Sequence, residues 1–206
     1  ALGIEYDGLA YSGWQKQKSP QQETVQQYVE TALSKIADRE IVASCAGRTD
    51  AGVHATCQVV HFESEIDRGD KAWIEGVNSL LPKSIRVLWS RKVGDDFHAR
   101  FSALSRRYMY LIYRRDTESA LLNGRATYVR RELDAQAMHI AAQSLLGEQD
   151  FSSFRAAGCQ SKTAMRNVMH ANIYRRGGIL IFDVKANAFL QHMVRNIVGS
   201  LLEVGR

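Results

Sequence analysis

The fold of this chain is decided by residues 41–62, which read IVASCAGRTDAGVHATCQVVHF. Apolar residues at both ends predict two strands, and the polar, glycine-containing middle predicts the turn between them. The turn carries a single carboxylate, Asp50, with Gly47 and Gly52 on either side. Glycine lets the backbone adopt conformations closed to other residues and lets a ligand come close. Since a strand behind the turn fixes where Asp50 points, the segment is typical of a reactive side chain presented to a ligand.

Helical periodicity marks the segments on both sides of this strand pair. Before it, apolar residues at i, i+3, i+4 and i+7 predict a helix that begins at Pro20 with Ser19 as its N-cap. After it, residues 73–81 have the same spacing and stop at Pro82. The stripe of the first helix consists of Val25, Tyr28, Val29, Ala32, Leu33 and Ile36.

The strands of the first half are predicted at residues 2–6, 41–46, 53–62 and 85–93. With the two helices they give the order β-α-β-β-α-β. This is the split βαβ, ferredoxin-like order, which is also the plan of common RNA-binding sheets.

The second half repeats much of this pattern. Its predicted elements are a strand at 104–114, a short strand at 127–129, a helix at 134–146, a hairpin of 168–174 with 179–186, and a helix at 189–204. By analogy with the first half, a last strand is expected after that helix, but the chain stops at Arg206 and Ala1 already stands in a strand, so native residues are expected to be missing at both ends.

The predicted fold class is therefore α+β, built from two ferredoxin-like, RNP-like halves at residues 1–95 and 96–206. Because no low-complexity linker separates the halves, their strands are expected to form one continuous, mostly antiparallel sheet flanked by helices.

Composition is that of an ordinary globular protein, with 45% hydrophobic and 24% charged residues in 206. No apolar run approaches the roughly 20 residues that a membrane helix needs, and no signal segment is evident, so a soluble, cytoplasmic protein is expected. The three cysteines form no C-x-x-C pair and the six histidines have no metal-site spacing. Neither a disulfide framework nor a metal site is predicted.

Basic residues are in modest excess and recur in pairs. The net charge is +5. Arginine binds phosphate with two hydrogen bonds and stacks on bases, so the pairs together favour a nucleic-acid surface, although each one alone is better explained as a solvated strand end. The pairs are Arg91-Lys92, Arg106-Arg107, Arg114-Arg115, Arg130-Arg131 and Arg175-Arg176.

Four side chains are candidates for chemistry, and each also has a structural explanation. Asp50 can bond its own backbone in an Asx turn, and Arg48 can be an exposed loop charge. Tyr108 can be ordinary sheet packing, although beside two arginines it is well placed to stack on a base. Arg195 can lay its stem on the core of its helix. Alternatively, it pairs with Asp50 and keeps that acid ionised in a dry pocket.

With these residues considered together, the chain resembles the tRNA pseudouridine synthase I (TruA) family over nearly its whole length. The Gly-Arg-Thr-Asp-Ala-Gly-Val-His string is highly specific to that family. The matching motifs, in family order, are residues 5–8, 11–15, 47–54, 97–101, 107–108, 150–154 and 192–196.

The resemblance implies roles for individual residues. It implies that Asp50 is the catalytic aspartate, Tyr108 an active-site tyrosine, Arg195 the arginine paired with the aspartate, and Arg48 the basic residue tied to flipping the target base. Tyr108 is also expected to contact the substrate. The further predicted substrate-binding residues are Thr49, Arg106 and Arg107.

The resemblance also implies the activity. It implies an isomerase with the pseudouridine synthase fold that converts uridine to pseudouridine at positions 38–40 of the tRNA anticodon stem-loop. It implies a homodimer that binds tRNA, with no metal or organic cofactor and with neither DNA nor a membrane as partner. The sequence leaves three chemical routes open: covalent attack of Asp50 at C1′, removal of the 2′ proton on a glycal route, or addition to C6 of the base.

Two other classes of function remain as alternatives. Sheets of this order with tyrosines and arginines also occur in noncatalytic RNA-binding modules. An acid in a glycine-rich turn also suits an aspartate-dependent hydrolase or phosphotransferase, but no Walker lysine or metal-carboxylate cluster is evident in the sequence.

Overall fold

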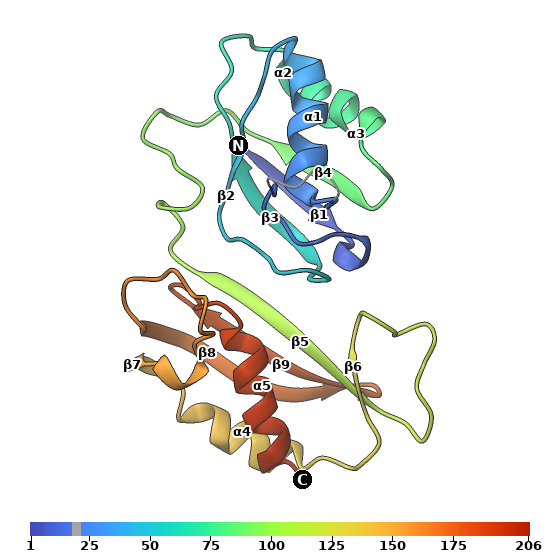
Figure 1. Ribbon diagram of the computed structural model, residues 1–206, viewed down its shortest axis with the longest axis vertical. Coiled ribbons are helices and arrows are strands. Elements are labelled where there is room, and N and C mark those ends of the chain that lie inside the picture. Colours follow the sequence, from blue (N-terminus) through green and yellow to red (C-terminus); the bar gives the residue numbers. More distant parts are fainter. Residues whose placement is uncertain (18–21) are drawn as a thin grey trace. The chain divides into compact units, whose positions relative to one another are not determined.

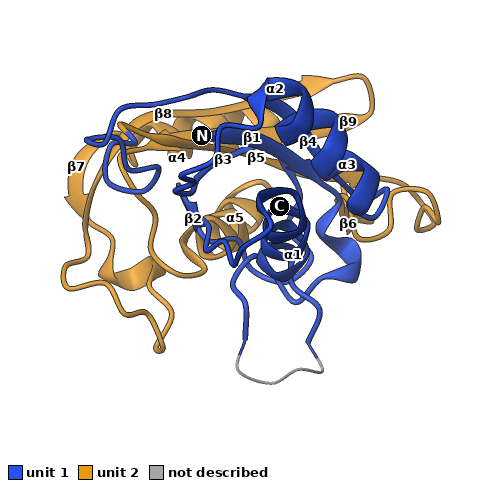
Figure 2. Cartoon of the chain, turned by 90° about the horizontal axis from the view of Figure 1, so that it is seen from above, with its two compact units in different colours: residues 1–103 blue, residues 104–206 orange. Residues whose placement is uncertain are grey.

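The computed structural model describes residues 1–17 and 22–206, and the chain divides into two compact units (Figure 1). Unit 1 is Ala1–Ala103 and unit 2 is Leu104–Arg206, coloured separately in Figure 2. The backbone N–H of Ala99 donates to Nδ1 of His61, 3.2 Å away, and this bond attaches the end of unit 1 to the rest of that unit. The boundary at residue 95 stays a prediction for domains.

Unit 1 contains an antiparallel sheet in the order β2-β3-β1-β4. This order and these directions are those of a split βαβ unit, as the sequence predicts. Its strands are β1 (Leu2–Tyr6), β2 (Ser44–Cys45), β3 (Ala55–His61) and β4 (Ile85–Ser90). Its helical segments are η1 (Gly8–Ala10), α1 (Val25–Ala37), α2 (Gly69–Lys71), η2 (Ala72–Gly76) and α3 (Val77–Leu80).

Helix α1 places its apolar stripe against the sheet. Val25, Val29 and Leu33 are fully buried in one core with Leu2 and Ile4 of β1. The helix begins at Val25 with Thr24 as N-cap, later than predicted. The predicted start, Ser19 and Pro20, lies outside the described residues.

The second helix of unit 1 is continuous but changes its winding. A π-helical stretch, η2, joins α2 to α3, and α3 ends at Leu80, just before Pro82, where the sequence predicts the stop. Strand β2 is shorter than predicted. Its ladder covers only Ser44 and Cys45, because the residues before it bond to α1 instead. The N–H of Ile41 donates to Oγ of Ser34 at 2.8 Å, and the N–H of Ala43 donates to Oε1 of Glu30 at 3.0 Å.

Unit 2 contains a five-stranded sheet in the order β6-β5-β9-β8-β7. All its pairs are antiparallel except β5 with β6, which is parallel. Its strands are β5 (Arg106–Arg114), β6 (Thr127–Val129), β7 (Gly147–Asp150), β8 (Met165–Arg176) and β9 (Ile179–Ala186). Its helical segments are α4 (Ala135–Gln143), η3 (Ser152–Phe154) and α5 (Met193–Val204).

Helices α4 and α5 lie side by side on one face of this sheet (Figure 1). Met138 of α4 and Met193 of α5 are fully buried with Ile112, Phe182 and Val184. Strand residues that alternate with these, such as Asp183, therefore point to the opposite face. Helix α5 begins at Met193 rather than at Phe189 as predicted, because His192 adopts a left-handed conformation with φ of 61°.

The sheet prediction needs one correction. Among the described residues, hydrogen bonds join the strands into two sheets, one in each unit, rather than into the single continuous sheet that the sequence predicts. The α+β class itself is confirmed. In the part of the chain that the structure covers, no helix is both long and apolar enough to cross a membrane.

Candidate active site

The turn between β2 and β3 is fixed by backbone contacts with the loop that follows β1. The N–H of Trp14 donates to the carbonyl oxygen of Thr49 at 3.0 Å, and the N–H of Gly52 donates to that of Tyr11 at 3.3 Å. Within the turn, the N–H of Val53 donates to the carbonyl oxygen of Asp50 at 3.2 Å. These bonds fix the backbone of the turn on both sides of Asp50.

Two glycines make this close approach possible. A Cβ atom at Gly13 would lie 2.6 Å from the carbonyl oxygen of Thr49, and Gly13 has a φ of +93°. Gly52 has a φ of +74°, a left-handed conformation that favours glycine. The loop motif at residues 11–15 is therefore in direct backbone contact with the turn motif at residues 47–54.

Side-chain hydrogen bonds from strands β1 and β3 also hold the turn. The hydroxyl groups of Tyr6 and Thr49 lie 2.8 Å apart. The buried Gln58 of β3 accepts a hydrogen bond from the N–H of Gly47 at 3.3 Å and donates to the carbonyl oxygen of the same residue. Neither Tyr6 nor Gln58 was predicted as a site residue. The signal for Tyr6 was its place in the motif at residues 5–8, and the signal for Gln58 was only that it is a polar side chain in a mostly apolar strand.

The exposure of the turn residues suits contact with a ligand. Asp50 and Thr49 are half-buried, whereas Arg48 is exposed. Burial raises the pKa of the nearby Cys45 thiol to about 11, and the positive charges of Arg48 and Arg100 act in the opposite direction. Two arginines therefore lie within electrostatic reach of the strand that leads into the turn.

In unit 2, Tyr108 lies on β5, on the face covered by the helices. It packs against the core, and its ring meets that of Phe189 edge to face with centroids 5.0 Å apart. Arg195 is exposed on α5, two residues after the buried Met193. Arg195 belongs to unit 2 and Asp50 to unit 1, and their pairing stays a prediction.

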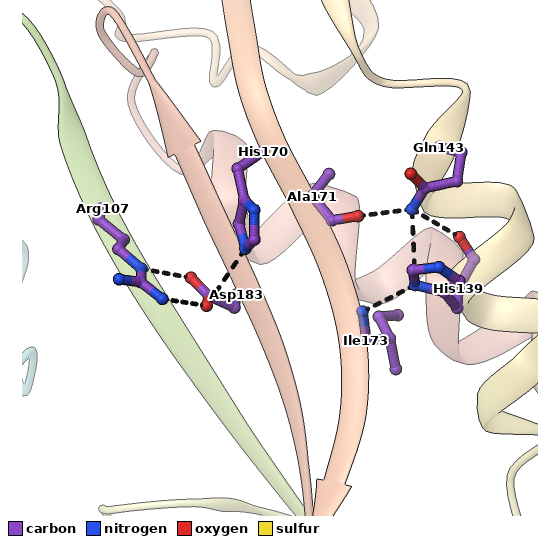
Figure 3. Close-up of polar contacts among 7 residues, drawn as sticks. All are labelled: Arg107, His139, Gln143, His170, Ala171, Ile173 and Asp183. Carbon is purple, nitrogen blue, oxygen red and sulfur yellow. Dashed lines mark hydrogen bonds and ion pairs between the residues drawn. The ribbon is translucent and has the colours of Figure 1, made fainter.

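The two arginines before Tyr108 make contacts within unit 2. Nη1 of Arg106 donates to the carbonyl oxygen of Asn187 at 2.9 Å. Arg107 binds Asp183 of β9 with two hydrogen bonds, one of them from Nε to Oδ1 at 2.8 Å (Figure 3). The sequence analysis assigns both arginines to substrate, and the structure adds these internal partners.

Asp183, which binds Arg107, is buried, with 2% of its surface exposed. The Arg107 guanidinium holds the pKa of that carboxyl below its usual range, and His170 contributes, with Nε2 3.2 Å from Oδ2. Figure 3 also shows a second polar cluster, in which Gln143 of α4 donates to the carbonyl oxygen of Ala171 at 2.7 Å. Both clusters connect neighbouring elements of unit 2.

Within residues 1–17 and 22–206, no three His, Cys, Asp or Glu side chains gather in a way that could hold a metal ion. The chemistry that the described side chains can supply is that of a carboxylate, a phenol and guanidinium groups. Such groups can attack or deprotonate a sugar, stack on a base and bind phosphate.

Comparison with known proteins defines the class of enzyme. A family model described as tRNA pseudouridine synthase matches residues 3–102 and 141–206. The chain is therefore a pseudouridine synthase, an isomerase that acts in tRNA modification.

Individual relatives identify the family within this class of enzyme. The chain is 58% identical over 206 residues to tRNA pseudouridine synthase A of Hydrogenovibrio crunogenus, covering all of this chain and 78% of that protein. It is also 58% identical over 205 residues to the proteins of the same name from Escherichia coli O1:K1 and Shigella boydii serotype 18, covering 75% of each. The chain belongs to the TruA family of tRNA pseudouridine synthases.

Proposed function

We propose that this chain isomerises uridine to pseudouridine at positions 38–40 of the tRNA anticodon stem-loop. The observation that carries the proposal is the half-buried Asp50 in a turn fixed by its backbone. The names of the relatives, which are tRNA pseudouridine synthases, support the substrate. The arginine pairs support binding to a polyanion.

Asp50 acts at the sugar in this proposal. The reaction breaks the bond from N1 to C1′, turns the uracil and rejoins it through C5. One carboxylate is sufficient because the detached base is also the incoming nucleophile, whereas glycosidases need a second carboxyl group to activate water. Asp50 attacks C1′ or takes the 2′ proton. Addition to C6 of the base is the third route.

Tyr108 and Arg195, from unit 2, serve the same reaction. Tyr108 stacks on the uracil and helps remove the C5 proton after the new bond forms. Arg195 pairs with Asp50 and keeps that carboxylate ionised. The edge-to-face contact of Tyr108 with Phe189 supports a fixed ring position for this role.

Arg48 and its neighbours bind and open the RNA. Arg48, exposed at the turn, occupies the space that the flipped uridine leaves, which offsets an unstacking cost of a few kcal/mol. Thr49, Arg106 and Arg107 contact the substrate backbone. A guanidinium has five N–H donors, and the Arg107 side chain is 55% exposed while it holds Asp183, so donors remain for a phosphate.

The proposed enzyme works as a homodimer in the cytoplasm, with one tRNA in contact with both subunits and without a metal or organic cofactor. Light scattering on the purified chain tests for the dimer. The rate of pseudouridine formation in excess EDTA tests for a metal cofactor, and an unchanged rate is expected.

Tritium release from tRNA transcript labelled at C5 of uridine tests the activity, because the isomerisation replaces that hydrogen by a carbon–carbon bond. The expected result is release by the wild-type chain and none by Asp50→Asn. Binding of tRNA with no release by the wild-type chain would instead support an RNA-binding module. Turnover that requires magnesium and yields free uracil or phosphate would support a hydrolase or phosphotransferase.

A further inference from the structure

The segment that follows β4 in unit 1 presents an exposed aromatic ring. Phe101 is 76% exposed, more than any other Phe, Tyr or Trp in the part of the chain that the structure describes. A single exposed ring is ordinary on a protein surface, so its neighbours decide whether it points to a ligand. The neighbouring residues show which kind of partner fits.

The turn that carries Phe101 is held by hydrogen bonds. Nδ1 of His98 accepts from the backbone N–H of Arg100 at 3.1 Å and from that of Phe101 at 3.4 Å. The N–H of Ser102 donates to the carbonyl oxygen of His98 at 2.8 Å, and Oγ of Ser102 accepts from the N–H of His98 at 2.9 Å. The ring of Phe101 therefore projects from a defined turn.

The same turn is attached to the sheet. The buried Ala99 donates its N–H to Nδ1 of His61 at the end of β3. Burial of the His61 imidazole lowers its pKa, which favours the neutral form that can accept this bond. His61 pairs with Ser44 of β2, and the residue after Ser44 is Cys45. The turn is thus connected to the strand that leads to Arg48 and Asp50.

Three aromatic rings and one arginine lie next to one another in this turn and at the end of β3. The ring of Phe101 lies on that of His98 with centroids 4.4 Å apart and planes 36° apart, and His98 lies 4.4 Å from His61. The guanidinium carbon of Arg100 lies 5.5 Å from the centre of the Phe101 ring. An exposed ring with an arginine over it can stack on an unpaired base while the arginine binds a phosphate.

We propose that Arg100 and Phe101 form a nucleotide platform, on which Phe101 stacks with an unpaired base of the tRNA substrate while Arg100 binds a neighbouring phosphate. The platform rests on the proposed function, since it supposes an RNA substrate. Charge favours RNA as the occupant over an apolar protein segment, because Arg48 and Arg100 are both exposed on unit 1 and the chain has a net charge of +5.

Equilibrium binding of a fluorescently labelled tRNA anticodon stem-loop measures the stacking. Phe101→Ala and Phe101→Leu should each weaken binding by about 5- to 150-fold, the range found when a base-stacking aromatic is removed. Phe101→Trp should bind within about twofold of wild type, since it keeps an aromatic face. Leu80→Ala, which trims another exposed apolar residue of unit 1, is the control and should bind as wild type does.

Salt dependence measures the role of Arg100. Arg100→Gln should reduce the slope of log affinity against log salt concentration by about one, as expected for the loss of one phosphate contact. Equal slopes for Arg100→Gln and wild type would overturn the part of the proposal that concerns the phosphate.

Two results would overturn the stacking role. Wild-type affinity in Phe101→Leu would show that apolar contact alone is sufficient or that the ring is not used. Weaker binding that appears only in variants with a lowered unfolding temperature would show that the ring stabilises the fold. The assay also separates this proposal from the proposed function. Wild-type affinity in both truncations with normal tritium release refutes only the platform, whereas weaker binding by the truncations with no tritium release from wild type refutes only the synthase.

Discussion

Asp50 in unit 1 and Asp183 in unit 2 are two aspartates held in different ways. Asp50 is half-buried in a turn, and backbone contacts of its neighbours with the loop after β1 fix its place. Asp183 is almost fully buried in a strand, and its own oxygens bind Arg107 and approach His170. A half-buried carboxylate in a turn with a fixed backbone suits chemistry, whereas an almost fully buried carboxylate in an ion pair suits stability. The following predictions test that contrast.

The largest expected effect is the loss of turnover when Asp50 loses its charge. Asp50→Asn keeps nearly the same shape, so the backbone contacts of the turn should remain and the unfolding temperature should stay within about 2 °C of wild type. The rate should fall by at least about 10³-fold, as for the removal of an essential catalytic group. Steady-state tritium release measures the rate, and a fall of less than tenfold would contradict the assignment.

A smaller loss is expected when Asp50 is kept but its support moves. In Gly13→Ala the added Cβ would lie 2.6 Å from the carbonyl oxygen of Thr49, so the turn must shift. Misplacement of a reacting group by about 1 Å can cost about 10²-fold in rate. Gly178→Ala, where the added Cβ meets nothing within 4 Å, is the matched control. Equal turnover numbers for the two variants would refute the role of the close contact between Gly13 and Thr49.

Removing the charge of Asp183 should affect stability rather than chemistry. Hydrogen bonds to charged groups contribute about 1.5–3 kcal/mol, so Asp183→Asn should lower the unfolding temperature by about 3–12 °C in a chain of this size. Asp116→Asn breaks the exposed pair with Arg114 and should change the unfolding temperature by about 4 °C or less. Calorimetry measures the unfolding temperatures of both variants. Equal shifts would show that the buried ion pair contributes no more to stability than the exposed one.

The smallest expected effect is on acid stability. Because Arg107 holds the pKa of Asp183 below its usual range, the folded chain releases this proton more readily than the unfolded chain. The stabilisation is therefore complete above the unfolded pKa of about 3.9 and is lost as pH falls through the lower, folded value. Urea unfolding between about pH 5 and 3 should show a steeper loss in wild type than in Asp183→Asn. Parallel curves would remove Asp183 from the acid response.

Periodicity predicted much of the fold because burial imposes it. The apolar stripe of α1 and the alternation in β9 lie where one face of each element meets a core. Strand β7, residues 147–150, was missed because its sequence Gly-Glu-Gln-Asp is polar, and only pairing with β8 makes it a strand. The late start of β2 follows from hydrogen bonds of Ile41 and Ala43 to side chains of α1, which only the folded chain brings together.

For the site, the sequence indicated Asp50 and Arg48 but not what holds them. Tyr6 and Gln58 are far from the turn in sequence, and only the sheet brings them to it. Arg107 could not be separated from Arg106 by sequence, because its partner Asp183 lies in another strand. The exposed ring of Phe101 is likewise a property of the folded turn.

The most direct test maps pseudouridine in a tRNA transcript after treatment with Asp50→Asn or Asp183→Asn, at a temperature where both variants are folded. The account predicts pseudouridine at positions 38–40 with wild type and Asp183→Asn, and none with Asp50→Asn. Pseudouridine formed by Asp50→Asn, or its absence with folded Asp183→Asn, would contradict it.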